Sequence, residues 1–217
     1  MIVRRLIDFG SALDEFTMKN LYGSTGPSRA EQTSEYAPPE ALLNGSWHWG
    51  PKHSIAKYDM WSVGVVMLEL ILGSPNVFQI SAKTRALLDQ QLEGWNESIK
   101  ELAYKLRSFM EMCILIPGIP ARLHHTGGTN DHVSLFVVLE SGYVSPVPWK
   151  CSEEFFSHQI KKKDPLKIGF PNVWALRLVR ELLNWDPEDR LSVDDALQHP
   201  YFSTTFSSMR QPRPEHM

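Results

Sequence analysis

The sequence predicts a mainly α-helical domain that is organised around one buried helix. Residues 58–73 carry only three plainly polar side chains, and the run ends at Gly73, a residue type that commonly terminates helices. A helix that is apolar on nearly every face belongs in a core rather than on a surface. The run is too short for a membrane span, which needs about 20 apolar residues, and it holds Glu69 in its interior.

The flanking regions predict further helices, because their apolar residues recur three or four positions apart. In chain order they are a short helix at 38–44, two helices within 81–116 that share one packed stripe, and an amphipathic helix at 172–185. Ser192 and Asp195 form the pattern of a capping box that opens a last helix. Asp186 before Pro187 predicts one more helix start.

Four stretches are not expected to be helical. Residues 2–7 form an apolar and basic strand, and residues 11–35 have the polar, Gly- and Pro-containing composition of a loop. Residues 117–150 are expected to be an insertion, whose β-forming segment at 133–139 either pairs locally or packs on the domain. Residues 203–217, with three prolines near the end, are expected to be disordered.

The composition suits one globular domain. The chain has 217 residues, of which 42% are hydrophobic and 22% charged. A formal net charge of -3 gives no electrostatic reason to expect a nucleic acid partner. No Cys or His spacing matches a structural zinc site, so we interpret His124, His125 and His132 as part of a solvated loop.

The two cysteines, Cys113 and Cys151, lie far apart in the sequence, and residues 1–7 are too short an apolar run for a signal peptide. We therefore expect reduced thiols and a cytoplasmic or nuclear protein that is not secreted and has no membrane partner. The short basic run Lys161–Lys163 is interpreted as the solvated end of a helix.

Four short motifs occur in a fixed order over about 195 residues. They are Asp8-Phe9-Gly10, Thr33-Ser-Glu-Tyr36-Ala-Pro-Pro39-Glu40, Asp59-x-Trp61-Ser62-x-Gly64 and Leu182-Leu183-Asn-Trp185-Asp186-Pro187-Glu-Asp-Arg190. In this order the chain resembles the C-terminal lobe of a Ser/Thr protein kinase domain, from the magnesium loop to the last helix. It departs from that family at Pro38, where the family has Ala.

The resemblance covers residues 1–202 and implies roles for several side chains. Asp8 would offer a carboxylate oxygen to a magnesium ion on the nucleotide phosphates, although we favour the simpler interpretation of an Asp that begins a turn. Thr33, in the same activation segment as Tyr36, would face the catalytic aspartate. The family would pair Glu40 with Arg190, and Asp59 would accept hydrogen bonds from the catalytic loop.

The catalytic loop itself, H-R-D-x-x-x-x-N, lies roughly 15 to 20 residues before the magnesium loop in the family, and only seven residues precede Asp8. A glycine-rich loop, its strand lysine and the partner glutamate are also missing. We therefore expect a C-terminal lobe without an N-terminal lobe, which is catalytically inactive and binds neither ATP nor magnesium. Asp59 is then either solvated or raised in pKa by an apolar setting.

A strongly apolar helix left half covered implies an exposed patch, so we expect a protein partner or the missing N-terminal kinase region to cover it. Three interpretations stay open. The chain is a phosphotransferase that uses ATP and magnesium as the intact family does, a non-catalytic pseudokinase-like module that binds proteins, or a truncated gene product. Together with the insertion at 117–150, the motifs also resemble plant kinase domains associated with a type 2C protein phosphatase.

Overall fold

A computed structural model describes residues 16, 20, 33–42, 56–114 and 151–203 of the chain. Over these residues the protein is helical and contains no strand. The mainly α-helical class predicted from the sequence is therefore confirmed. The strands expected at 2–7 and 133–139, the insertion at 117–150 and most of the tail lie outside the described residues.

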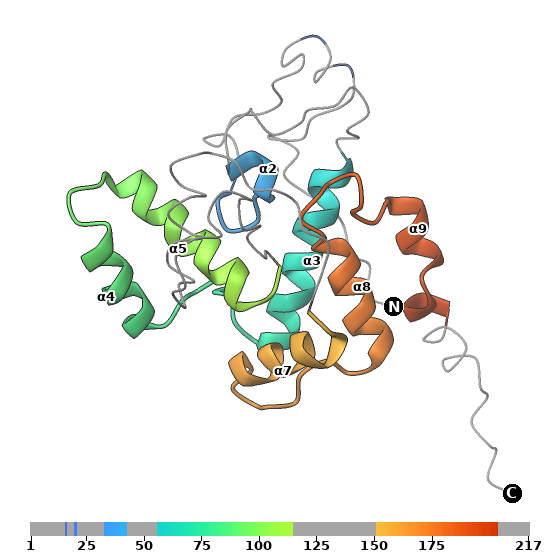
Figure 1. The fold of residues 1–217 in the computed structure, drawn as a ribbon. Coiled ribbons are helices and arrows are strands. Elements are labelled where there is room, and N and C mark those ends of the chain that lie inside the picture. The colour runs from blue at the N-terminus through green and yellow to red at the C-terminus, as the bar shows by residue number, and fades with distance from the viewer. Residues whose placement is uncertain (1–15, 17–19, 21–32, 43–55, 115–150, 204–217) are drawn as a thin grey trace, which may run out of the picture.

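The described helices surround α3, which runs through the centre of the molecule (Figure 1). Helix α8 packs along it, α9 contacts it beside α8, α7 contacts α8, and α4 packs against α5. Their bounds are α2 Pro39–Leu42, α3 Ala56–Leu72, α4 Ala82–Gln91, α5 Glu97–Glu111, α7 Glu153–Lys163, α8 Val173–Leu182 and α9 Val193–Gln198.

Most of these helices match the predicted ones and begin with the expected chemistry. Ser192 accepts a hydrogen bond from the Asp195 amide, as in the predicted capping box, and Gly73 ends α3 with φ +62°. One prediction is wrong: no helix starts at Pro187. Asp186 instead accepts a hydrogen bond from the Glu188 amide (2.9 Å) and closes a turn, which an aspartate can also favour.

Helix α3 is buried on one face and open on the other. At about 100° per residue, its core stripe and its exposed stripe lie roughly opposite each other. The core stripe, all 5% exposed or less, is Trp61, Val65, Leu68 and Leu72. The exposed stripe is Val63, Val66 and Leu70, and Leu70 is 79% exposed. The expectation of a central buried helix that is only half covered matches this arrangement.

A glycine sets the distance between α3 and α8. A Cβ atom added to Gly64 would lie 2.9 Å from Leu183 Cδ2 and 3.0 Å from Leu182 Cβ. Those distances are shorter than van der Waals contact, so an alanine at this position would push α8 away from the core helix. This explains in steric terms why the predicted motif carries glycine here.

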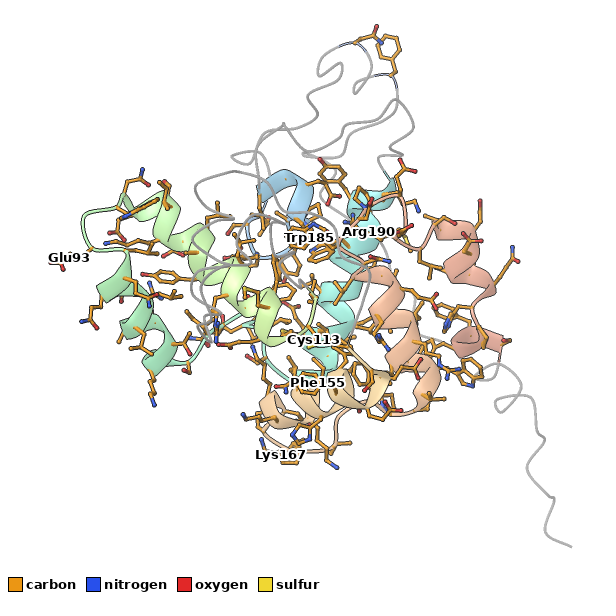
Figure 2. The ribbon with its side chains drawn as sticks, in the orientation of Figure 1. Glu93, Cys113, Phe155, Lys167, Trp185 and Arg190 are labelled. Carbon is orange, nitrogen blue, oxygen red and sulfur yellow. A yellow bond between two sulfur atoms is a disulfide. The ribbon has the colours of Figure 1, made fainter. Side chains whose placement is uncertain are left out.

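The cysteines differ from the expectation. The structure joins Cys113 to Cys151 in a disulfide, with Cα atoms 6.2 Å apart, so the prediction of two separate reduced thiols is wrong. The sequence did not indicate this bond, because 38 residues separate the two cysteines. In the structure the end of α5 and the start of α7 lie close together (Figure 2). Cys113 has φ +59°, which turns the chain sharply after α5. A cross-link over a loop of this length contributes roughly 2–4 kcal/mol by restricting the unfolded chain.

Among the helices that the structure describes, none combines the length and the apolar content required to cross a bilayer.

Candidate functional site

The predicted site residues fall into two groups. The first group, which belongs to the described part of the chain, is Thr33, Tyr36, Glu40, Asp59, Trp61 and Arg190. Asp8, Phe9 and Gly10 lie outside that part, so the structure does not test a magnesium loop. Among the described residues no group of three His, Cys, Asp or Glu side chains could hold a metal ion.

Glu40 and Arg190 form a bidentate ion pair in the interior. Arg190 Nη1 donates to Glu40 Oε1 at 2.7 Å and Nη2 donates to Oε2 at 2.8 Å. The two residues are 5% and 1% exposed, although 150 positions separate them in the sequence. The arginine therefore fastens α2 to the segment between α8 and α9, which is the pairing that the motifs led us to expect.

Arg190 lies near Trp185 in the interior (Figure 2), and its remaining donors are also used. Its Nε donates to the Asn184 carbonyl (3.1 Å), and Nη1 also donates to the Lys57 carbonyl (2.8 Å) at the start of α3. Its Cζ lies 5.2 Å from the centre of the Trp61 ring. Because each buried donor finds an acceptor, the charge is compensated from three parts of the chain.

The turn before α2 rests on α3 and α5. The amides of Tyr36 and Ala37 donate to the Thr33 carbonyl at 3.0 and 3.1 Å, which closes the turn. Ser62 of α3 donates to the Tyr36 carbonyl (3.2 Å). Lys105 of α5 donates to the carbonyls of Ser34 and, at 3.3 Å, Glu35. Lys105 could not be identified from the sequence, because no motif or periodicity distinguishes it from the other lysines of its helix.

The side chain of Tyr36 is tied to the same helix. A hydrogen bond to the Glu69 carboxylate raises the pKa of the Tyr36 hydroxyl, and the negative charge of Glu69 adds to this effect. Thr33, in contrast, is exposed. The turn therefore presents Thr33 to solvent and holds Tyr36 against α3.

A hollow of about 410 Å³ opens beside this turn. Its apolar lining comes from α2, the α3–α4 connection and α5, and charged side chains also line it. The lining includes Leu42, Val77, Phe78, Ile80 and Leu102, with Glu35, Arg85, Glu101 and Lys105 as the charged groups. Such a hollow can receive an extended peptide or an apolar side chain.

Asp59 stands in the first turn of α3, on the same side of the helix as the exposed stripe. Partial burial of its carboxyl group raises the pKa of Asp59 above its usual value. Asp59 is also exposed, so solvation and a raised pKa, which were expected as alternatives, occur together.

Comparisons with known proteins agree with the motifs. A family model described as "Protein kinase domain" matches residues 3–202. A protein of Arabidopsis thaliana named "Probable inactive protein kinase" is 69% identical over 204 residues, which are 94% of this chain and 51% of that protein. Mitogen-activated protein kinase 8 of Arabidopsis thaliana is 31% identical over 71% of this chain and 19% of its own length. Cyclin-dependent kinase C-2 of Oryza sativa subsp. japonica is also 31% identical, over 78% of this chain and 24% of its own length.

The chain thus spans about half the length of the first relative and a quarter or less of the other two.

Neutralising either member of the buried pair should destabilise the protein by about 3–5 kcal/mol, because the partner charge then remains desolvated without compensation. Glu40→Gln and Arg190→Met, singly and combined, can be compared by urea unfolding. We expect Arg190→Met to cost more, since it also removes the hydrogen bonds that Arg190 donates to the carbonyls of Lys57 and Asn184. An exchange of the two charges should recover only part of the loss, because a glutamate at 190 would face those carbonyl oxygens.

The exposed pair of Arg85 and Glu101, with side chains 56% and 57% exposed, provides the control. Glu101→Gln should change the unfolding free energy by less than about 1 kcal/mol. If the Glu40 and Arg190 variants were additive within about 0.5 kcal/mol, the proposed coupling would be wrong.

Asp59→Asn should make the protein equally or more stable at pH 7. The folded-state pKa of Asp59 is raised, so its charged form costs stability above that pKa, and the cost vanishes below the unfolded value near about 3.9. Urea unfolding between pH 4 and pH 8 should give a difference between variant and parent that shrinks as the pH falls. A variant less stable than the parent at pH 7 would indicate a stabilising hydrogen bond to the carboxylate instead.

Proposed function

The chain belongs to the protein kinase domain family, and from this premise we propose that it is a non-catalytic kinase-fold module that binds a protein through the open face of α3. The relative that is 69% identical is named as a probable inactive kinase, which supports the same interpretation for this chain.

The observation that carries the proposal is the exposed stripe of α3. Val63, Val66 and Leu70 are 46%, 42% and 79% exposed, and they follow each other at spacings of three and four residues. This is the spacing with which one helix packs against another. The proposed occupant is an apolar helical segment, supplied either by a partner protein or by the N-terminal region of a kinase domain.

The 217 residues lack several of the groups that phosphoryl transfer requires in this family. Active members of the family bind ATP with magnesium and use a catalytic-loop aspartate and asparagine. The 217 residues contain no H-R-D-x-x-x-x-N motif, and the described residues contain no cluster of acidic groups that fits a magnesium ion. We therefore propose that the chain binds neither ATP nor magnesium, and we derive no chemical step through them.

A second candidate is a protein Ser/Thr kinase activity. It is favoured by Asp8-Phe9-Gly10, which matches the family's magnesium loop, and by the relatives that are named as kinases. In that case Asp8 would hold the ion, and the catalytic aspartate would come from outside these 217 residues.

A cytoplasmic or nuclear location stays a prediction. The sequence-based argument for it assumed reduced thiols, whereas the structure joins Cys113 to Cys151 in a disulfide. The finer resemblance to plant kinase domains associated with a type 2C phosphatase stays a prediction.

Thermal unfolding with and without Mg-ATP tests the absence of nucleotide binding. A site with a Kd one hundredth of the ligand concentration would stabilise the fold by about 2.7 kcal/mol, or roughly 5–10 °C in Tm for a domain of this size. We expect no shift and no phosphate transfer to a generic substrate. Transfer above background that Asp8→Asn removes would establish the kinase activity instead.

Co-expression tests the open face of α3. The probe is the half of the Arabidopsis relative that lies outside the match, with Leu70→Ser as the variant. Because burying a leucine contributes about 1.5–3 kcal/mol, the change should weaken complex formation by at least about tenfold in a pull-down titration. Leu197→Ser is the control, since Leu197 is 68% exposed but belongs to another helix, α9. Binding by Leu70→Ser equal to that of the parent would contradict the proposal.

A further inference from the structure

A tight loop after α7 carries two exposed aliphatic side chains. Leu166 is 76% exposed and Ile168 is 68% exposed, whereas Gly169 directly after them is buried. Isolated exposed aliphatic residues are ordinary on protein surfaces, but two in one short loop need a closer look at what holds them there.

The loop is fixed by one buried carboxylate. Asp164, only 2% exposed, accepts hydrogen bonds from the amides of Leu166 (2.8 Å), Ile168 (2.7 Å) and Gly169 (2.8 Å). These hydrogen bonds lower the pKa of Asp164, with the one from Gly169 contributing most, so the carboxylate stays ionised at neutral pH. Lys167 has φ +57° and Gly169 has φ +73°, which completes the sharp turn. The outward direction of the two aliphatic side chains is therefore built into the backbone.

Three exposed lysines belong to the same short segment as these two side chains. Lys161 and Lys162 are exposed in the last turn of α7, and Lys167 sits between Leu166 and Ile168, with its Nζ donating to the Lys162 carbonyl (2.5 Å). The acidic residues of α7, Glu153 and Glu154, lie in its first turn at the other end of the helix. A local cluster of three lysines thus stands on a chain whose formal net charge is -3.

The neighbouring Lys163 has a different role. Its Nζ donates to the carbonyls of Gln79 (3.1 Å) and Val77 (3.5 Å), and burial lowers its pKa. It anchors the end of α7 to the segment after α3. The expectation that all three lysines of the run form a solvated helix end therefore holds for the first two but not for the third.

We propose that this surface, formed by residues 161–168, binds a membrane that contains anionic lipids. Leu166 and Ile168 enter the headgroup region, and Lys161, Lys162 and Lys167 face the lipid phosphates. This is a surface contact, distinct from a membrane span. It departs from the sequence-based expectation of no membrane partner, because the structure shows that the turn held by Asp164 exposes the aliphatic pair next to the lysines.

Two observations favour lipid over a protein as the occupant. The aliphatic pair projects outward, with more than two thirds of each side chain in solvent, and Lys167 lies at the outer edge of the molecule beyond α7 (Figure 2). A bilayer surface adapts to such a projection, whereas a protein would need a matching groove. The charges also complement an anionic surface, and lysines near such a surface each add to the attraction. Two aliphatic side chains and three lysines form a small anchor, so the binding is weak and reversible.

Vesicle co-sedimentation tests the proposal with the whole chain. The probes are vesicles of phosphatidylcholine alone and vesicles with about one-third phosphatidylserine, at low and at raised salt. We expect binding to the anionic vesicles only, and a loss of binding as salt screens the charges. The double variant Leu166→Ser/Ile168→Ser should lower the partition coefficient at least about tenfold, and Lys161→Glu/Lys162→Glu should abolish binding.

Leu197→Ser is the matched control, because Leu197 is 68% exposed, as is Ile168, but belongs to α9. It should bind as the parent does, and unchanged thermal unfolding of all variants shows that the fold is intact. No binding to anionic vesicles at low salt overturns the proposal. Equal binding to both kinds of vesicle, or full binding by the double serine variant, overturns it as well. Loss of a protein complex in that variant, without vesicle binding, would assign the surface to a protein groove instead.

Discussion

A desolvated guanidinium group governs the architecture of this chain. Arg190 has 1% of its surface in solvent, and a cation in that position is tolerable only when acceptors surround it. Glu40 supplies two of them, and backbone carbonyls at Lys57 and Asn184 supply others. The start of α3, helix α2 and the segment after α8 must therefore meet at one point. Because the turn at 33–36 directly precedes α2, this contact also fixes the position of the turn.

Each of the four sides of α3 makes a different contact in the fold. One side builds the core through Trp61, and the side with Gly64 admits α8 at close range. A third side holds the turn through Ser62 and Glu69, and the fourth, with Leu70, is left in solvent. A helix that is apolar all round usually has neighbours all round. The uncovered fourth side is thus the feature that most distinguishes the described residues from a closed domain.

Much of this could be predicted from the sequence, for identifiable physical reasons. The core helix and the pairing of Glu40 with Arg190 follow from a long apolar run and from motifs that fix both charges. The turn at Pro187 could not be predicted, because aspartate followed by proline suits a helix start and a turn equally. Lys105 and the pair of Cys113 with Cys151 depend on contacts between distant segments, which periodicity along one segment does not encode. The loop held by Asp164 is local, but its hydrogen bonds follow no helical or strand period. The suggested magnesium ligand Asp8 lies outside the described residues.

The bond between Cys113 and Cys151 makes a closed ring out of the chain between α5 and α7. A single protease cut inside this ring would produce two polypeptides that remain covalently joined by the disulfide. They would separate on a denaturing gel only after a thiol reagent had reduced that bond. Limited digestion of this protein, viewed without a reductant, would therefore conceal such a cut. New sequence could likewise be inserted between the two cysteines without separating the helices that the bond holds together.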